Sequence, residues 1–465
     1  MKKTIILGII LAMTTMLCGC SGGETARRRV KQEIVVACGR DATGTMKNLM
    51  NEFTAQSETT QVKLIEFPNE STELYRAVSA MLAGKEVPLD AMLIEDVWVG
   101  EFVKNGYLLP LGGSVGFDRD SYHPAIVNFA QTDGELYWYP LILDTGLMYY
   151  REDITDGSLD YRRLAEQSTI RYAIQGADGE EMICCAMELI QLTGSVRDGV
   201  RLYKKAIDGA VPGDPVTSFK NGDAAYVRAW ACDNGDIMRG YSPVAAQVGT
   251  KVLMRTDGEA YTTARAYGMS VNAASEKTEN VKELINYLAT PDVKNRILKE
   301  MGTLPMQAAD YENPFISYYR DYIDDTFPMF QTLKFRPKKE DYTHLSKGAE
   351  TALSEYLAGD GSIDAAAAAI ENLLDDIPVD AARYFFNSRP ETPVVFDLEL
   401  AKRQDSENPV YYVQYAHARI CTMLANLAAD GHNVPQAGEI DAALLNKPEE
   451  RELIKQLAML PEEIT

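Results

Sequence analysis

The sequence predicts an α/β fold over most of its length, followed by an all-α tail. Apolar strands and amphipathic helices alternate from residue 33 onward, and this alternation predicts a parallel sheet covered by helices on both faces. The length of 465 residues favours two to four domains with sizeable cores. Past about residue 377 the alternation stops and a helical pattern replaces it.

The elements of the body follow one another at short spacing. Residues 33–38 are expected to form an apolar strand, and a loop over residues 39–44 leads to a helix over residues 45–56. The inward face of this helix carries Met46, Leu49, Met50 and Phe53. The next expected elements are a strand over 62–67, a helix over 72–83, a strand over 89–94, and a helix that follows Asp96 and runs to Asn105.

A short hydrophobic leader precedes the body. Two lysines open the chain, and the apolar stretch over residues 5–17 is too short to span a membrane but has the flanks of a secretory signal. The Leu-Cys-Gly-Cys run that ends at Cys20 resembles the bacterial lipobox, whose cysteine is lipidated and becomes the mature N-terminus. This resemblance implies a signal peptide over residues 1–20, a tether over 21–32, and lipid anchoring at the extracellular face of the cell membrane. The alternative is an ordinary signal peptide with two incidental cysteines.

Composition argues against several function classes for the body. A net charge of −22 argues against a nucleic-acid binder, which needs a basic face. Seven irregularly spaced cysteines predict neither a disulfide framework nor a paired metal motif, and four scattered histidines argue against a histidine-rich metal site. We therefore expect no metal, no cofactor and no nucleic-acid partner for the body.

Several short landmarks occur in a fixed order along residues 33–377. They are Met81–Lys85, Pro88–Ala91, Gly106–Leu111, Gly134–Pro140, Asp144–Tyr150, Ser218–Tyr226, Ala266–Val271 and Gly302–Pro305. In this order they resemble the extracellular solute-binding proteins of ATP-driven (ABC) importers, family 1, whose typical members bind sugars.

The resemblance implies a two-lobed, periplasmic-binding-protein-like (type II) α/β fold with a hinge and an interlobe cleft. Lobe closure around a ligand would then be a hinge motion. The crossing strand is expected near residues 141–150, with the return near residues 272–276. Lobe one would take residues 33–142 with part of 275–345, and lobe two about 150–270.

Tryptophans are the first candidates for ligand contact, because sugars stack their apolar faces on flat aromatic rings. The chain has three, and all lie where the family's cleft loops are expected. Trp230 and Trp98 are the candidates. Trp138 is weaker because it alternates with Tyr137 and Tyr139 like an ordinary half-buried strand. For each of them a core position is the alternative.

Charged side chains near strand ends are the second set of candidates, because carboxylates and guanidinium groups bind hydroxyls. This set consists of Arg40, Asp41, Glu95, Asp96, Asp144 and Arg228. Asp144, at the expected crossing, is the foremost of them. For the others a helix cap or a solvated loop charge is the alternative, and for Asp96, directly before a helix, capping competes most strongly.

Catalysis by these carboxylates is a further alternative. A glycosidase needs two carboxylates at a fixed separation about the scissile bond, and nothing in the sequence favours that arrangement over binding. The sequence contains no glycine-rich phosphate loop, nucleophile elbow or metal-ligand cluster. We expect no catalytic residues in the body.

The tail carries a long and specific motif. The run Asn-Pro-Val-Tyr-Tyr-Val-Gln-Tyr-Ala-His-Ala-Arg at residues 408–419 strongly resembles arginyl-tRNA synthetase, where its catalytic domain meets its helical anticodon-binding domain. The resemblance covers residues 378–465. The residues themselves predict a helix from Pro409 to about Ala429, capped by Asn408. Its tyrosine-rich stripe is explained more simply as a bundle core than as a tRNA contact.

The synthetase family activates arginine with ATP through a domain bearing HIGH-type and KMSKS-type motifs, and neither occurs in this sequence. The resemblance therefore implies a catalytically inactive tail, with tRNA as a partner only if the tail is a functional fragment. Because tRNA chemistry is cytosolic and a lipobox directs export, we interpret the chain as a chimeric reading frame. A genuine fusion whose tail adds helices is the alternative.

Together these observations predict a lipid-anchored solute-binding receptor that takes a sugar or oligosaccharide and delivers it to an ABC permease. Amino acids, peptides or polyamines are other solutes that related receptors serve. An arginine–tRNA ligase, supported by the tail alone, and an extracellular carbohydrate-active enzyme are the competing functions.

Overall fold

The computed structural model describes most of the body and separate positions of the tail. The described residues are 30–68, 70–84, 88–166, 169–238, 242–255, 258–312, 329–330 and 332–374, with 409, 419–420, 423–424, 427, 445–452 and 454–455 in the tail. Cys20, Asn408 and most of the expected tail helix lie outside them, so the lipobox and the cap stay predictions. The chain divides into two compact units, residues up to Leu374 and Asp375–Thr465.

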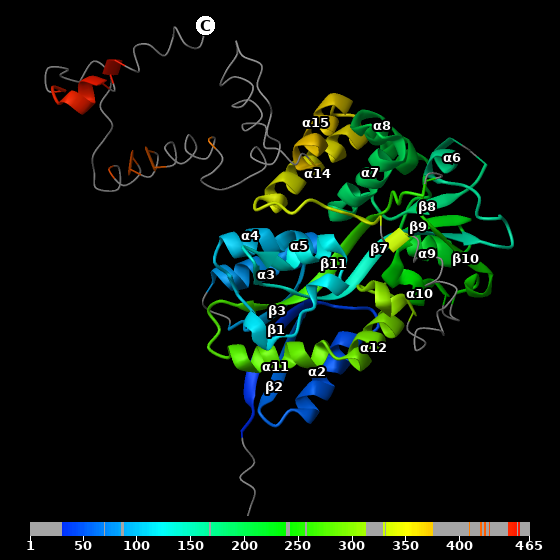
Figure 1. The fold of residues 1–465 in the computed structure, drawn as a ribbon. Coiled ribbons are helices and arrows are strands. Elements are labelled where there is room, and N and C mark those ends of the chain that lie inside the picture. The colour runs from blue at the N-terminus through cyan, green and yellow to red at the C-terminus, as the bar shows by residue number, and fades with distance from the viewer. Residues whose placement is uncertain are drawn as a thin grey trace, which may run out of the picture. The chain divides into compact units, whose positions relative to one another are not determined.

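Lobe one is built on three parallel strands, with β1 between β2 and β3. They are β1 (Gln32–Gly39), β2 (Thr60–Phe67) and β3 (Ala91–Glu95). One face carries α2 (Thr45–Gln56), α11 (Thr278–Leu288) and α12 (Pro291–Met301), and the other carries α3 (Ser71–Ala83), α4 (Val99–Lys104) and α5 (Pro124–Ala130) (Figure 1). Helices on both faces explain why the residues of β1 between Ile34 and Cys38 are all buried.

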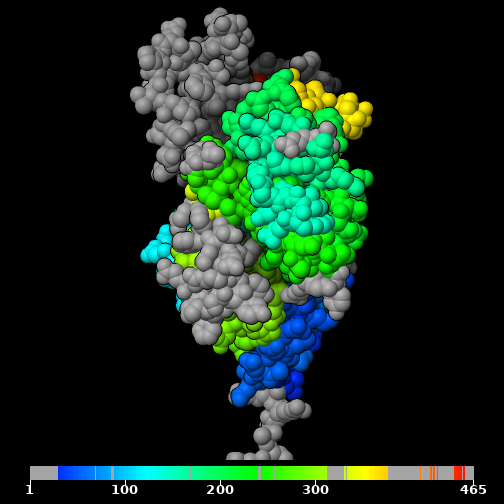
Figure 2. All heavy atoms as spheres, turned by 90° about the vertical axis from the view of Figure 1, so that its right-hand side faces the viewer, coloured from blue at the N-terminus to red at the C-terminus, as the bar shows by residue number. Residues whose placement is uncertain are grey.

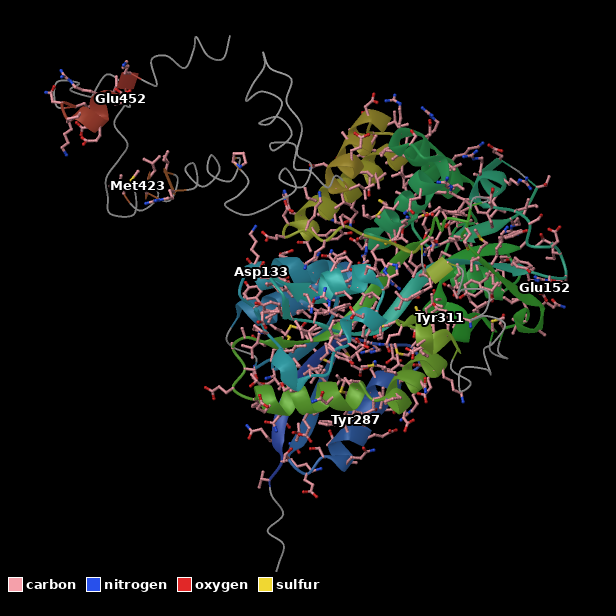
Figure 3. The ribbon with its side chains drawn as sticks, in the orientation of Figure 1. Asp133, Glu152, Tyr287, Tyr311, Met423 and Glu452 are labelled. Atoms are coloured by element: carbon pink, nitrogen blue, oxygen red, sulfur yellow. The ribbon has the colours of Figure 1, made fainter. Side chains whose placement is uncertain are left out.

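The predicted α/β alternation is confirmed in this region. Helix α2 has the predicted bounds because Met46, Leu49, Met50 and Phe53 form the buried face that was expected. The strands β1, β2 and β3 and the helix α3 begin and end within two residues of their predicted bounds, whereas α4 begins only at Val99, because residues 96–98 form a separate 3₁₀ turn. Tyr287 of α11, labelled in Figure 3, packs on Phe53 of α2 with ring centroids 5.4 Å apart.

Two long antiparallel strands cross between the lobes. They are β7 (Tyr139–Arg151) and β11 (Thr263–Asn272), which pair with each other from Tyr139–Met269 to Thr145–Ala264. Strand β7 covers the expected crossing. The return lies earlier than the expected residues 272–276, because Tyr267–Val271 of β11 already pair with β3 of lobe one.

Lobe two continues from β7 through a second set of strands and helices. Its strands are β8 (Tyr172–Ile174), β9 (Tyr226–Trp230) and β10 (Val248–Val252). Its helices are α6 (Tyr161–Glu166), α7 (Gly179–Thr193), α8 (Val196–Gly209), α9 (Pro215–Lys220) and α10 (Asn234–Met238). Figure 2 shows lobe two, in teal and green, next to the blue N-terminal part of lobe one.

Two closing helices complete the body. They are α14 (Tyr342–Ala358) and α15 (Ile363–Leu374), which pack on each other and on α7 and α8 of lobe two. Helix α14 also contacts the turn η1 (Asp96–Trp98) of lobe one. The remaining short strands are β4 (Leu108–Leu109), β5 (Gln131–Thr132), β6 (Glu135–Leu136) and β12 (Lys334–Phe335). Within the described ranges, no helix is both long and apolar enough to cross a bilayer.

The described part of the tail is helical at most of its positions, including Pro409, Arg419–Ile420 and Met423–Leu424. This agrees with the expected all-α tail.

Candidate functional site

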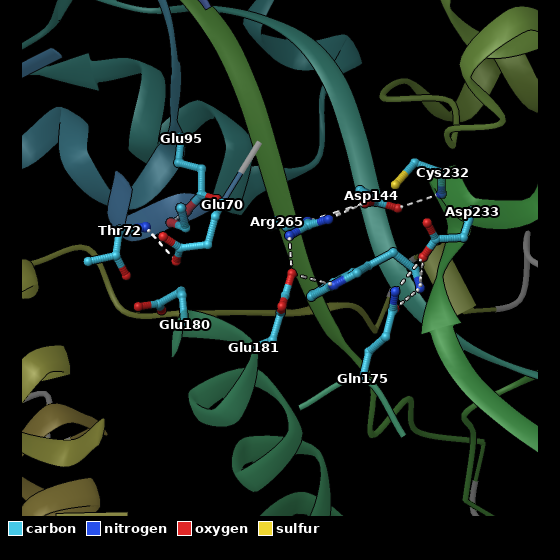
Figure 4. A network of polar contacts seen from close by, with 12 residues as sticks. Glu70, Thr72, Glu95, Asp144, Gln175, Glu180, Glu181, Cys232, Asp233 and Arg265 are labelled. Carbon is cyan, nitrogen blue, oxygen red and sulfur yellow. Dashed lines mark hydrogen bonds and ion pairs between the residues drawn. The ribbon is translucent and has the colours of Figure 1, made fainter. Parts of the chain in front are cut away.

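A set of mostly buried charged side chains, together with one tryptophan, lies where β3, the two crossing strands and α7 converge (Figure 4). We call this set the interlobe network. It consists of Glu95, Asp96, Asp144, Glu180, Glu181, Glu188, Arg228, Trp230, Arg265 and Arg336. Its position at the carboxyl edge of parallel strands is where open α/β sheets bind ligands.

Asp144 is the centre of the network on β7. Its Oδ2 atom pairs with the guanidinium of Arg265 on β11 at 3.0 Å, and its Oδ1 atom accepts hydrogen bonds from the backbone N–H groups of Cys232, at 3.1 Å, and Thr145, at 3.0 Å. Asp144 therefore joins both crossing strands to the turn that follows β9. Sequence reasoning placed Asp144 at the crossing, but it did not identify Arg265 as its partner.

Trp230 ends β9 and lies between two arginines. The guanidinium carbons of Arg228 and Arg265 lie 4.2 Å and 3.8 Å from the centroid of its ring. Its Nε1–H donates to Glu181 Oε1 at 3.2 Å, and Arg265 donates to the same oxygen at 3.3 Å. Because guanidinium groups cover the indole, Trp230 is a cation–π partner in this arrangement rather than an open platform for a sugar.

Arg228 pairs with Glu188 of α7. Both side chains are fully buried, and the guanidinium makes two bonds to the carboxylate, at 2.6 Å and 3.1 Å. Within the part of the chain that the structure describes, its Nη1 atom is buried and has no hydrogen-bond partner. A two-bonded arginine–carboxylate pair is directional, so Glu188 fixes how Arg228 lies against Trp230.

Arg336 organises the other end of the network. Its guanidinium lies 3.1 Å from Glu95 Oε2, 3.0 Å from Asp96 Oδ1 and 3.0 Å from Glu180 Oε1. Glu95 also accepts hydrogen bonds from Tyr267 and Ser71. Three carboxylates thus share one buried cation, and the cluster has an excess of acidic groups.

Burial raises the pKa of three carboxyl groups in or near the network, those of Asp96, Asp233 and Glu180. Removal from water raises the pKa of Asp96 to about 7, although the charge of Arg336 opposes this shift. Burial likewise raises the pKa of Asp233 to about 6, with the nearby Asp144 adding to the effect. Asp233 accepts hydrogen bonds from Gln175 and from the backbone of Trp230.

The candidates in the first loop lie differently. Arg40 is exposed at the end of β1. Asp41 accepts hydrogen bonds from the backbone N–H groups of Thr45 and Met46, at 3.0 Å and 3.1 Å. Asp41 therefore caps the start of α2, which was the alternative to ligand binding for this residue.

The other two tryptophans lie in the core of lobe one. Trp98 packs against Tyr75 and Phe102, with ring centroids 5.6 Å and 6.4 Å away. Trp138 is buried and donates from Nε1 to the carbonyl of Ile94 at 3.1 Å. Both positions match the core alternative.

Sequence reasoning missed five members of the network: Glu180, Glu181, Glu188, Arg265 and Arg336. A signal for two of them was present. Glu188 interrupts the apolar run Met182–Ile190 of α7, and Arg265 interrupts the mostly apolar strand β11. A charge in a buried element needs a partner, so either residue could have been identified as a candidate.

The network contains many carboxylate oxygens that can accept hydrogen bonds, whereas its three arginines already pair with carboxylates. Carboxylate oxygens of this kind accept hydrogen bonds from hydroxyl and amino groups. Glu181 is the carboxylate most open to solvent, with 38% of its side chain exposed. Among the residues that the structure describes, no three His, Cys, Asp or Glu side chains are placed to hold a metal ion.

Comparisons with known proteins match the two parts of the chain to different families. Residues 48–320 match the family model of bacterial extracellular solute-binding proteins, and residues 413–465 match that of the DALR anticodon-binding domain. The tail is 50% identical over 97 residues to the arginine–tRNA ligase of Caldanaerobacter subterraneus subsp. tengcongensis, and 53% identical over 96 residues to that of Symbiobacterium thermophilum. These matches cover 21% and 20% of this chain, and the chain spans only 17% of the length of each ligase.

Solved structures match the body. Maltose-bound MalE3 of T. maritima superposes with a TM-score of 0.66 at 21% identity, covering 74% of this chain and 98% of that one. The acarbose-binding GacH receptor of Streptomyces glaucescens gives 0.64 at 18% identity, covering 74% and 99%. UgpB of Mycobacterium tuberculosis, in complex with glycerophosphocholine, gives 0.61 at 18% identity, covering 74% and 98%. These similarities show the two-lobed fold.

Proposed function

Because the chain belongs to the bacterial extracellular solute-binding protein family, we propose that it is a lipid-anchored receptor that binds a sugar or oligosaccharide between its lobes and delivers it to an ABC permease. The observation that carries this proposal is the interlobe network. It places buried and half-buried carboxylates from both lobes at the crossing strands. Sugar hydroxyls are donors that such carboxylates can accept.

The residues that would contact the solute include two from outside the sequence-based candidates. Glu181 is held by Arg265 and Trp230 through one oxygen and is partly open to solvent. Gln175 contacts the same tryptophan: it accepts from the backbone N–H of Trp230 and donates to Asp233. We propose that Asp144 and Arg265 orient these groups, and that Trp230 acts through Glu181 rather than by stacking on the sugar.

Cys20 supplies the proposed anchor, since its lipobox-like context implies lipidation and a place at the extracellular face of the cell membrane. Mass spectrometry of the N-terminal peptide from membranes of the native host would detect the lipid on Cys20. A mature chain that begins downstream of Cys20, or one that retains Cys20 without a lipid, would reject the anchor.

Solute binding is tested by isothermal titration calorimetry of the full chain against a panel of mono- and oligosaccharides. We expect saturable binding without product formation. The variant Glu181→Gln should weaken this binding by roughly tenfold, because a charge-assisted hydrogen bond contributes about 1.5–3 kcal/mol. Release of a hydrolysed product would instead support the carbohydrate-active enzyme.

For the tail, we propose that it has no ligase activity, because its ligase-like part spans 17% of those enzymes. An ATP–pyrophosphate exchange assay with arginine should give no signal above that of a protein-free control. We also propose that the reading frame is chimeric. Long-read sequencing across codons 365–390 in the native genome should find two separate genes, and an uninterrupted join in genome and transcript would reject this proposal.

A further inference from the structure

Arg336 is positioned to contact both lobes at once. Its backbone follows β12, which pairs with Thr263 and Ala264 at the start of the crossing strand β11. Its side chain is fully buried. The guanidinium bonds to Glu95 and Asp96 at the end of β3 in lobe one, and to Glu180 in the first turn of α7 in lobe two.

The partners of Arg336 are held in place by their own lobes. In lobe one, Glu95 accepts from Tyr267 at 2.9 Å and from Ser71 at 3.1 Å. Asp96 accepts from the backbone N–H of Ala266 at 3.1 Å. These carboxylates therefore cannot follow Arg336 if it moves with the other lobe.

In lobe two, Glu180 is held by the closing helix α14. Tyr342 donates to Glu180 Oε1, and Ser346 donates to Oε2 at 2.6 Å. Glu180 lies on α7 and therefore moves with lobe two, whereas α14 packs on α7 and also bonds to lobe one, where Thr343 donates to Glu101. When the lobes separate about the crossing strands, Arg336 must give up its bonds to one side.

Loss of the carboxylates of one lobe would destabilise the buried guanidinium of Arg336. A buried charge that loses its partner is strongly unfavourable unless water replaces the partner. Among the described residues, the Nε atom of Arg336 is buried and already lacks a hydrogen-bond partner. A further loss of partners would therefore add to an existing unsatisfied donor. The ion pair between Arg336 and Glu180 therefore opposes separation of the lobes.

We propose that Arg336 is a positioning residue that sets the balance between open and closed lobes through its divided contact with Glu95, Asp96 and Glu180. This inference rests on the proposed function only in that solute binding requires the lobes to open and close. Arg265 also links a crossing strand to α7, but its 3.3 Å bond to the half-exposed Glu181 is a weaker tie.

The test measures the distance between the lobes in the full chain without solute. Spin labels attached through non-natural amino acids at exposed Lys47 of α2 and exposed Lys205 of α8 would report this distance by pulsed electron resonance. The variant Glu180→Gln removes the charge but keeps one carbonyl oxygen that can accept from Tyr342, and its NH2 group can donate to the hydroxyl oxygen of Ser346. We expect Glu180→Gln to raise the ratio of open to closed populations about tenfold.

Two further variants keep the test decisive. Arg336→Lys retains the charge but loses the planar, branched donors of the guanidinium that reach Glu95, Asp96 and Glu180, so an intermediate shift is expected. Arg296→Lys is the matched control, because Arg296 pairs with Glu52 and Glu300 within lobe one and should leave the distances unchanged.

Identical distance distributions for Glu180→Gln and the parent protein would overturn the proposal, and so would a parent protein that is already fully open. Because no solute is present, this outcome is independent of the sugar panel. Failure of every sugar to bind would reject the proposed function and leave the measured lobe balance valid.

Discussion

Trp98 and Trp230 are equally buried, with 2% of each residue exposed, but they lie in opposite surroundings. Trp98 is surrounded by the rings of Tyr75 and Phe102 in the core of lobe one. Trp230 lies between the guanidinium groups of Arg228 and Arg265 at the crossing. Burial alone therefore does not separate a tryptophan packed among aromatic rings from one packed among charged side chains. The chemistry of the neighbours does, because buried charges persist only where partners compensate them.

The largest effect is expected where the surroundings are apolar. Trp98→Ala should lower the free energy of unfolding by about 3–5 kcal/mol, because it leaves a cavity among packed rings. Urea unfolding followed by circular dichroism measures this loss, and the solute affinity of the folded fraction should not change. A loss below about 1 kcal/mol would show that Trp98 is not a core residue.

Removing a charge beside Trp230 should have the next largest effect. Arg228→Met leaves Glu188 buried without a counter-charge and should cost about 3 kcal/mol of stability. The double variant Arg228→Met with Glu188→Met should recover most of this loss, since an apolar pair of similar volume can replace a buried ion pair. A double variant as unstable as the single one would contradict the assigned pairing.

The network should also make stability depend on pH, which the aromatic core cannot do. Burial raises the pKa of Asp96 from 3.8 to about 7, so the folded protein holds this proton more tightly than the unfolded chain. The resulting stabilisation is complete below about pH 4 and is lost as the pH rises toward 7.

This pH dependence can be isolated with one variant. The melting temperature of the parent should fall by several degrees relative to that of Asp96→Asn between pH 4.5 and 8. Glu95, Glu180 and Arg336 are present in both proteins, so the two proteins differ only in the carboxyl group at position 96. Parallel melting curves for the two proteins would refute the raised pKa.

The smallest effect on stability is expected from a conservative change at Trp230. Trp230→Phe keeps an aromatic ring between the arginines but removes the Nε1–H donor to Glu181, at a cost of about 1 kcal/mol. Solute binding should weaken several-fold because Glu181 loses its orientation. Trp98→Phe is the control and should not affect calorimetric binding, and equal effects of both changes would remove the functional distinction between the two tryptophans.

Local structure could be predicted closely from the sequence. The helix at Thr45–Gln56 matched because its apolar residues recur on one face, and β7 covers the expected crossing. The return strand was predicted too late in the sequence. Residues 267–271 of β11 pair with β3 of lobe one, although residues up to about 270 were assigned to lobe two. Of the site candidates, Asp41 turned out to cap a helix, and Trp98 to pack in the core.

The sequence by itself determined the α/β class, the elements of lobe one and the change of family in the tail, because these depend on local periodicity and on continuous motifs. Only the tertiary structure decided the partners. Asp144 meets Arg265 across 121 residues, and Arg336 meets Glu95 across 241. Such pairings follow from the crossing of β7 and β11, which brings distant charges into a shared, poorly hydrated space where each must find a counter-charge.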